Sequence, residues 1–387
     1  MRFAHLADCH LGSWRQPELQ KLNLESFTKA LDICIQEKVD FVLIAGDLFD
    51  SAYPGIEILE EAFFQLKRLK DNDISCYIIA GSHDFSASGK TFLNVLEKSG
   101  FCRNIFQAEE KQEKIFLNPV IHKNIALYGY PGKKSSLEIQ ELRRIKLQDS
   151  PFFKILMLHT SIKDAIGSLP IESIDEKELP KADYYALGHL HIDYENGKFI
   201  YAGPIFPNNF QELEELKYGS FYIIETSPLT IKRVELKLKE VEVLDLEISN
   251  SLIATEKIIS ELSKRELKDK IILLRISGKL EQGKISDINF REIESFAKDK
   301  GAYVLLKSVS KLETEEPEIS LAVEDMNNLE EEIIKKYLQE KKSKFDSLIP
   351  SLLNALSLEK QEDEKSAVFE QRLFSDVNKI LSLENDN

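Results

Sequence analysis

Histidine and aspartate residues recur directly after apolar runs along the first half of the chain. They form five motifs, in this order: Asp8-Cys9-His10, residues 46–50 (GDLFD), residues 81–84 (GSHD), His159, and residues 188–191 (GHLH). These motifs hold five of the seven histidines. Ligands collect at the carboxyl ends of strands in open α/β sheets, so we expect the motifs to converge on one crevice. Carboxylates and neutral imidazoles that converge in this way form a site for divalent metals.

Residues 1–230 alternate predicted strands and helices, which indicates an α/β layered fold with crossover helices. Apolar stripes at helical spacing predict helices over 24–35 and 56–69. The expected strands cover 3–7, 40–45, 75–80, 124–128, 154–158, 184–187, 198–202 and 221–224.

The pattern changes after residue 230. Residues 231–311 predict a β-α-β-α-β unit without any histidine, and therefore a second, small domain without metal chemistry. Residues 312–325 are acidic and contain Pro317, which predicts a linker. Residues 326–387 contain apolar-striped helical stretches at 329–338, 345–356 and 367–381. These stripes pack either on the chain's own domains or on a partner helix, and the acidic linker favours the partner.

Composition restricts the class of protein. The net charge of −15 argues against coating of nucleic acid by bulk electrostatics, although it leaves local DNA contact open. The four cysteines form no CxxC pair, which is typical of a reduced, intracellular protein. No apolar run approaches the roughly 20 residues that span a bilayer, and the first residues lack the pattern of a signal peptide. We therefore expect a cytoplasmic protein that does not enter membranes.

Spacing by two residues sends alternate side chains to the same face of a strand, and it recurs in the first and last motifs. Asp47 can bridge two cations through its two oxygens. We expect the first metal to bind Asp8, His10, Asp47 and His191. We expect the second metal to bind Asp47, His159 and His189, with Ser82 as a further candidate. Two metals about 3.5–4 Å apart polarise a phosphoryl oxygen and lower the pKa of water, and this donor set suits Mn²⁺, Fe²⁺ or Zn²⁺.

Five phrases carry a resemblance to a known family: HLADCHLG, IAGDLFD, AGSHDFS, LMLHTS and YYALGHLH. They resemble the calcineurin-like metallophosphoesterase superfamily. The closer resemblance is to the SbcD nuclease family, whose archaeal and eukaryotic members are called Mre-Eleven. It spans the whole chain. It implies a metallophosphoesterase β-sandwich flanked by helices, a small α+β capping domain, and a C-terminal helical segment that binds a coiled-coil, SMC-like ATPase.

The resemblance also implies roles for individual residues. His83 would not bind metal but would lie beside the scissile phosphate and serve the leaving oxygen, with Asp50 as its carboxylate partner. The family usually has asparagine where this chain has Ser82. A serine hydroxyl is shorter, so Ser82 either binds the second metal directly or is replaced there by water.

The implied activity is that of a nuclease with two Mn²⁺ ions per subunit. It would cut duplex ends as a 3′-to-5′ exonuclease and single strands as an endonuclease, as a homodimer assembled with the ATPase (named Rad-Fifty or SbcC) for double-strand break repair. Loop positions suggest DNA contacts at Trp14, Arg15, Lys133 and Lys134. One alternative is a phosphatase or cyclic-nucleotide phosphodiesterase, although GDLFDSA lacks the arginine with which protein phosphatases grip phosphate. Another is a non-catalytic, metal-containing scaffold.

Overall fold

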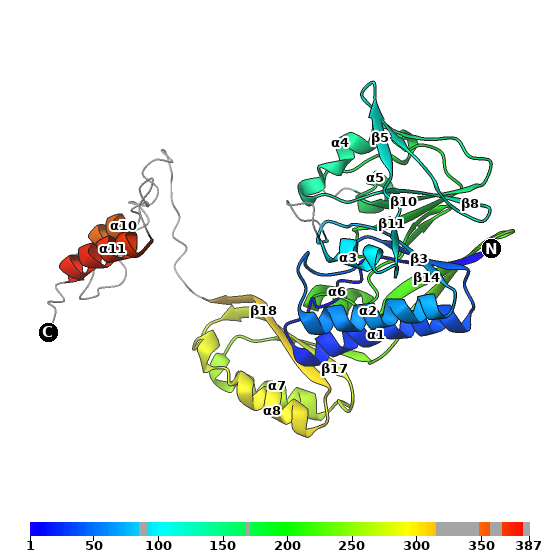
Figure 1. The fold of residues 1–387 in the computed structure, drawn as a ribbon. Coiled ribbons are helices and arrows are strands. Elements are labelled where there is room, and N and C mark those ends of the chain that lie inside the picture. Colours follow the sequence, from blue (N-terminus) through cyan, green and yellow to red (C-terminus); the bar gives the residue numbers. More distant parts are fainter. Residues whose placement is uncertain (85–90, 168–170, 315–347, 357–365, 382–387) are drawn as a thin grey trace. The chain divides into compact units, whose positions relative to one another are not determined.

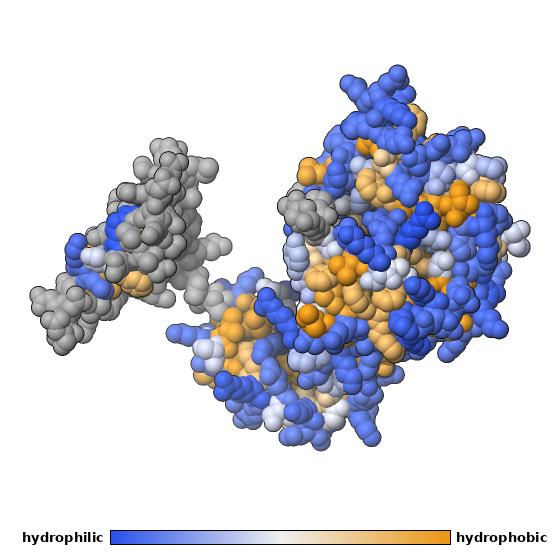
Figure 2. Space-filling view, in the orientation of Figure 1, coloured by the Kyte–Doolittle hydropathy of each residue, from blue (hydrophilic) through white to orange (hydrophobic). Residues whose placement is uncertain are grey.

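The computed structural model describes residues 1–84, 91–167, 171–314, 348–356 and 366–381. Contacts between residues divide the chain into two units, residues 1–314 and residues 315–387. Most of the visible surface of the first unit is hydrophilic, interrupted by apolar patches (Figure 2). Among the described helices, none is long and apolar enough to cross a membrane.

Two six-stranded sheets form the body of the first unit (Figure 1). The first sheet has the order β15 (Leu229–Leu236), β14 (Gly219–Thr226), β1 (Arg2–Leu6), β2 (Phe41–Ala45), β3 (Ser75–Ile79) and β4 (Arg103–Asn104). The second has the order β12 (Tyr194–Asn196), β13 (Phe199–Tyr201), β11 (Tyr184–Gly188), β10 (Phe153–His159), β8 (Ile125–Tyr130) and β7 (Val120–His122). The central strands of each sheet are parallel, so each sheet collects its strand carboxyl ends at one edge.

The two sheets pack face to face on a core that includes Phe3, Phe41, Met157 and Tyr184, all fully buried. The outer face of the first sheet is covered by α1 (Pro17–Gln36), α2 (Ile56–Asp71) and α3 (Phe92–Lys98). The outer face of the second is covered by α4 (Glu138–Leu142), α5 (Lys163–Ile166) and a small sheet of β5 (Ala108–Lys111), β6 (Lys114–Leu117) and β9 (Ile145–Leu147). This layering confirms the α/β metallophosphoesterase sandwich expected from the sequence.

Residues 241–314 form a cap on this sandwich. It consists of β16 (Val241–Glu247), α7 (Ala254–Ser263), β17 (Ile271–Leu280), α8 (Phe290–Asp299) and β18 (Val304–Thr314). Both helices pack on one face of a three-stranded parallel sheet. The other face contacts the sandwich through Ile271, Leu273 and Leu306, which meet Trp14 and Leu213. The cap therefore shares a core with the sandwich.

Three expected boundaries differ from the structure. The first strand of the β-α-β-α-β unit expected from residue 231 is in fact two strands: β15 pairs along its full length with β14 and belongs to the first sheet, and β16 pairs with β17 in the cap. The division expected after residue 230 thus falls after Leu236. Residues 312–314 of the expected linker belong to β18, which buries Leu312 in the cap core. Helix α1 begins at Pro17 rather than near residue 24, and proline is favoured in the first helical turn.

In the second unit, α10 (Ile349–Leu356) and α11 (Ser366–Leu381) coincide with two of the predicted helical stretches. The stretch expected over 329–338 and most of the expected linker lie outside the described residues.

Candidate metal centre

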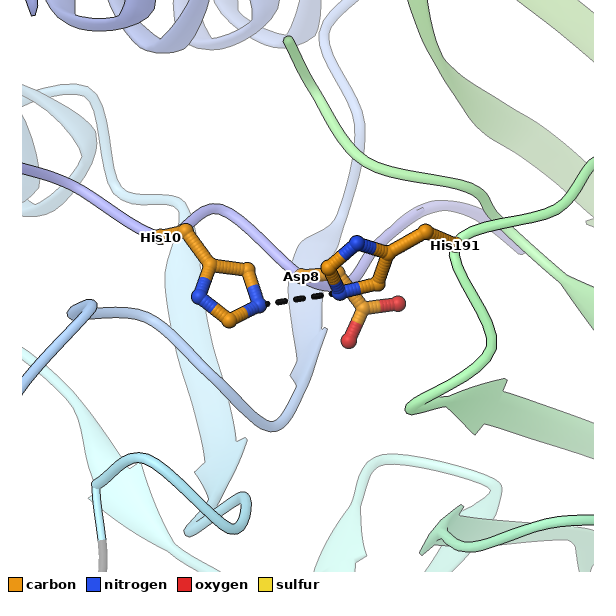
Figure 3. A group of neighbouring side chains, drawn as sticks. All are labelled: Asp8, His10 and His191. Atoms are coloured by element: carbon orange, nitrogen blue, oxygen red, sulfur yellow. Dashed lines mark hydrogen bonds between the residues drawn. The ribbon is translucent and has the colours of Figure 1, made fainter. Parts of the chain in front are cut away.

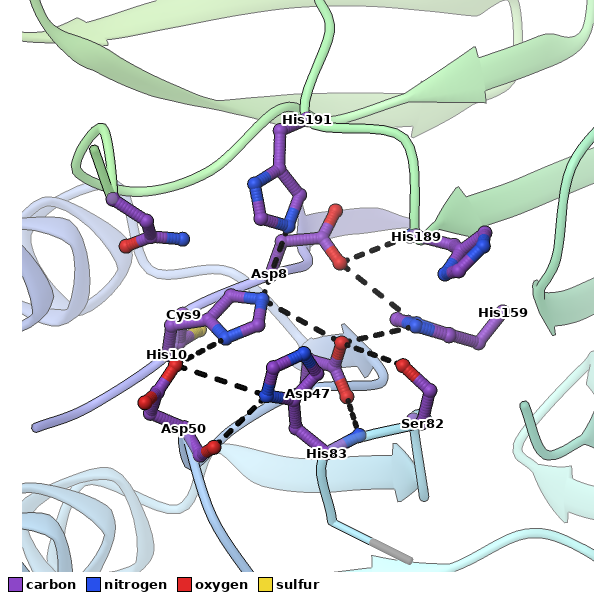
Figure 4. A network of polar contacts seen from close by, with 12 residues as sticks. Asp8, Cys9, His10, Asp47, Asp50, Ser82, His83, His159, His189 and His191 are labelled. Atoms are coloured by element: carbon purple, nitrogen blue, oxygen red, sulfur yellow. Dashed lines mark hydrogen bonds and ion pairs between the residues drawn. The ribbon is translucent and has the colours of Figure 1, made fainter. Parts of the chain in front are cut away.

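The five motifs converge where the carboxyl ends of the two sheets meet (Figure 4). Asp8, Asp47 and Ser82 follow β1, β2 and β3 of the first sheet, whereas His159 ends β10 and His189 follows β11 of the second. Two hydrogen bonds join the sheets here. The backbone N–H of His189 donates to Asp8 Oδ1 at 2.9 Å, and His159 Nδ1 donates to the Ala45 carbonyl at 3.0 Å.

One group of donors consists of Asp8, His10 and His191, whose ligand atoms lie within 4.8 Å of one another (Figure 3). His10 Nε2 and His191 Nε2 face each other at 3.0 Å. Each of these rings turns its Nδ1 to a carboxylate: His10 to Asp50 at 3.1 Å and His191 to Glu212 at 2.9 Å. A carboxylate at one ring nitrogen fixes the tautomer and leaves the other nitrogen for a cation.

A second group consists of Asp8, Asp47 and His159. Asp47 Oδ2 lies 3.1 Å from His159 Nε2 and 3.5 Å from His10 Nε2, so one carboxylate oxygen faces imidazoles of both groups. Asp8 Oδ2 is buried without a hydrogen-bond partner among the described residues. Two overlapping donor groups and an unpaired buried oxygen fit a site for two divalent cations.

The other two expected ligands lie at the edge of the second group. Ser82 Oγ donates to Asp47 Oδ2 at 3.4 Å, which places the hydroxyl at the oxygen that also faces His159. The His189 ring lies edge-on to that of His159, with ring centroids 5.1 Å apart. Burial, with a smaller contribution from His159, lowers the pKa of His189 to about 4, so its imidazole is neutral at pH 7.

The charges inside the site depend on one another. Burial raises the pKa of Asp8, because a carboxylate that is removed from water is less stable in its ionised form. Burial would also raise the pKa of Asp47, but the imidazole of His159 outweighs it and keeps that pKa below its usual value. Burial likewise opposes protonation of His159, yet Asp47 raises its pKa to about 10. Asp47 thus favours protonation of His159, and His159 favours ionisation of Asp47.

The backbone at the site is strained. Asp8, His10, Asp47 and His189 have φ values of 50°, 42°, 51° and 99°, in or near the left-handed region that side chains rarely adopt. Such strain gathers at functional sites when the surrounding structure holds it in place. Space is equally restricted, because a Cβ atom on Gly132 would lie 2.5 Å from His159 Cδ2.

The residues assigned to catalysis lie at the rim. His83 is half exposed, and its Nδ1 donates to the backbone carbonyl of Asp50 at 2.8 Å. The Asp50 carboxylate is 3.7 Å from His83 but hydrogen-bonds the buried His10. The Asp50 carboxylate therefore lies between two imidazoles, His10 at hydrogen-bonding distance and His83 at the longer distance of an ion pair, and the Asp50 backbone adds a second contact to His83.

Sequence reasoning missed two residues of the site. Asp84, almost fully buried, accepts backbone N–H groups of Leu48, Phe49 and Gly81 and so ties the second motif to the third. Its sequence signal was its place in GSHD. Glu212 hydrogen-bonds His191 but lies outside every motif. Its sole sequence signal is the spacing Asn209-x-x-Glu212, which is typical of a helix start.

The four residues expected to contact DNA differ in their exposure to solvent. Trp14 is 8% exposed, and its Nε1 donates to the Pro207 carbonyl, so burial between sandwich and cap contradicts its expected role. Lys133 is half-buried and forms an ion pair with Glu141. Arg15 and Lys134 are exposed.

Known proteins share this sequence pattern. Residues 1–193 match the family described as calcineurin-like phosphoesterase. The chain is 28% identical over 309 residues to the DNA double-strand break repair protein Mre11 of Methanocaldococcus jannaschii, covering 76% of this chain and 77% of that one. Its Methanococcus maripaludis counterpart is 28% identical over 357 residues, covering 88% and 91%. That of Sulfolobus acidocaldarius is 29% identical over 293 residues, covering 71% and 74%.

Proposed function

Residues 1–193 are a calcineurin-like phosphoesterase domain, and from this premise we propose that the chain is a DNA nuclease of double-strand break repair. The observation that carries the proposal is the double donor group at the junction of the two sheets, with His83 at its rim. The relatives named as repair proteins support it, since the match to the Methanococcus maripaludis protein covers 88% of this chain and so extends beyond the phosphoesterase domain.

We assign the first cation to Asp8, His10, Asp47 and His191. We assign the second to Asp47, His159 and His189, with Ser82 at its side. Two bound cations would supply Lewis-acid stabilisation of a phosphoryl oxygen and a water of lowered pKa. The absence of a thiolate from the donor set favours Mn²⁺ over softer metals, with Fe²⁺ or Zn²⁺ as alternatives.

His83 is the proposed proton donor to the leaving 3′ oxygen. The Asp50 carbonyl accepts from Nδ1, which leaves Nε2 as the second ring nitrogen, free to face substrate. A ring held in this way acts as a positioned general acid. Asp50 would contribute twice, by its backbone to His83 and by its carboxylate to His10.

The finer parts of the proposal concern substrate and assembly. They are 3′-to-5′ exonuclease action on duplex ends, endonuclease action on single strands, and the division into sandwich, cap, linker and helical segment. The exposed apolar side chains Ile56 and Phe64 on α2 support a homodimer through the nuclease helices. The apolar content of α10 supports docking of the C-terminal helices on a coiled-coil, SMC-like ATPase.

The test is digestion of end-labelled duplex DNA in Mn²⁺ by the wild-type chain and by His83→Ala. We expect His83→Ala to lose activity by about 100-fold or more while it keeps its bound metal. An unchanged cleavage rate would refute the role of His83. Hydrolysis of p-nitrophenyl phosphate without any cleavage of DNA would favour the phosphatase alternative.

A further inference from the structure

A short helix connects the candidate metal centre to the cap. Helix α6 (Phe210–Leu216) is preceded by its N-cap residue Asn209, whose side chain accepts the Glu212 backbone N–H at 2.9 Å. Leu213, in its middle, is fully buried in the cluster that contains Ile271 and Leu273 of the cap strand β17. The N-cap hydrogen bond of Asn209 therefore fixes the start of the helix, and the packing of Leu213 fixes its middle.

One side of α6 faces the site. Glu212 Oε1 lies 2.9 Å from His191 Nδ1, and Glu212 Oε2 accepts the Asn208 backbone N–H at 2.8 Å. Asn209 Nδ2 adds a hydrogen bond of 2.6 Å to Oε1. Both carboxylate oxygens are thus held, and the side chain is 16% exposed. His191 donates its Nδ1 proton to this fixed acceptor and presents Nε2 to His10 and Asp8.

The other side of α6 faces the cap. Glu214 forms an ion pair with Arg275 of β17. The Arg275 guanidinium also lies over the Phe210 ring, 5.7 Å from its centroid. Phe210 and Glu214 are four residues apart and share one side of the helix, whereas Glu212 lies between them and points away. The Arg275 side chain is 17% exposed, so this contact is largely shielded from solvent.

We infer that Glu212 is a positioning residue for His191, and that α6 makes its placement depend on the cap through Arg275. A hydrogen-bonded carboxylate behind a metal-binding histidine typically changes metal affinity by 10–100-fold. The inference rests on the proposed function only for its consequence in catalysis, since the contacts themselves concern cation binding.

The test measures Mn²⁺ binding to the full chain by calorimetry, independently of DNA. We expect Glu212→Ala to weaken one of the two sites by roughly 10–100-fold and Glu212→Gln, which keeps an acceptor, to weaken it less. Glu215→Gln is the matched control, because it removes the same charge from an exposed position of the same helix. It should bind like the wild type. Arg275→Ala should weaken the same site several-fold, although it removes nothing from the site.

A second readout separates positioning from a general loss of structure. Long-range ¹H–¹⁵N spectra of the metal-free chain should show His191 protonated at Nδ1 in the wild type and in Glu212→Gln. In Glu212→Ala the two tautomers should mix. Wild-type affinity and an unchanged tautomer in Glu212→Ala would overturn the role of Glu212, and wild-type affinity in Arg275→Ala would overturn the link to the cap. Tight Mn²⁺ binding without DNA cleavage would instead refute the proposed function and leave this inference intact.

Discussion

At the scale of the residue, the site is built from groups that oppose folding. Asp8 and Asp47 combine a buried carboxylate with a left-handed backbone, and each feature costs free energy on its own. The fold tolerates this loss of folding free energy because these positions hold the donors for the proposed cations. Stability and function are therefore opposed at these residues.

Replacement of Asp8 by asparagine should reveal this opposition. Asparagine tolerates the left-handed conformation, can still accept the His189 N–H and carries no charge. In EDTA we expect Asp8→Asn to raise the free energy of unfolding by about 1 kcal/mol, and in Mn²⁺ we expect it to lower metal affinity. Urea unfolding in both conditions measures this. A variant less stable than the wild type in EDTA would contradict the argument.

His5 gives the chain a pH dependence that is separate from the metal ligands. It lies between the sheets with Nδ1 3.0 Å from the Tyr184 hydroxyl, and burial lowers its pKa to about 3. The unfolded chain protonates His5 near pH 6.5, so its contribution to stability is present above that pH. It is lost as pH falls toward 3, by about 1.4 kcal/mol per unit.

The double variant His5→Leu/Tyr184→Phe removes both polar groups of this pair. Between pH 7 and pH 5 in EDTA, the wild type should lose about 2 kcal/mol more of its free energy of unfolding than the double variant does. Equal losses would show that His5 does not titrate as its burial requires.

At the scale of the element, the loops after the strands pack so closely at Gly132 that no side chain fits there, and this packing brings the donors together. Gly132 follows β8, and its N–H donates to the Ala80 carbonyl at 3.0 Å, which joins the loop to the first sheet. A Cβ atom there would strike His159. The close approach of this loop thus helps to define where the imidazole lies.

Gly132→Ala should therefore displace His159. We expect a loss of about 1–3 kcal/mol in stability and weaker binding at the second metal. Gly55→Ala is the control, since its Cβ would meet nothing nearer than 3.5 Å. Thermal unfolding and Mn²⁺ titration of both variants measure the effect. Wild-type behaviour of Gly132→Ala would mean that the loop moves aside.

Features that depend only on neighbouring residues, such as strands and short motifs, could be predicted from the sequence. Apolar runs located the strands, and the motifs after them contain Asp8 and His10, which the structure brings together with His191. The sequence could not predict contacts that arise from the tertiary arrangement. Glu212 is 21 residues from His191 in the chain. The contact of the Asp50 carboxylate with His10, 40 residues away in the chain, arises in the same way, beside its contact with His83. Trp14 became a core residue because the cap covers it.

At the scale of the whole molecule, the end of the cap is set by β18. Leu312 is buried in the cap core, so a chain cut at residue 311 loses a core side chain, whereas one cut after Thr314 keeps the first unit whole. We expect the chain ending at Thr314 to cut DNA in Mn²⁺ without binding the ATPase. The chain ending at Lys311 should be less stable by about 1–3 kcal/mol.

Unfolding in urea, DNA digestion and co-purification with the ATPase test these two chains against the full one. Retained ATPase binding by the chain ending at Thr314 would refute the docking role of the C-terminal helices. Equal stability of the two shortened chains would refute the extension of β18.

The donors come from both sheets of the sandwich, Asp8, His10 and Asp47 from one and His159 and His191 from the other. A cation that binds all of them therefore binds the closed sandwich and not the separated sheets. At a concentration 100 times its dissociation constant, such a ligand adds about 2.7 kcal/mol to the folded state. Scarcity of the metal would then shorten the lifetime of the chain against proteases as well as slow its reaction, so metal supply would regulate the abundance of the protein.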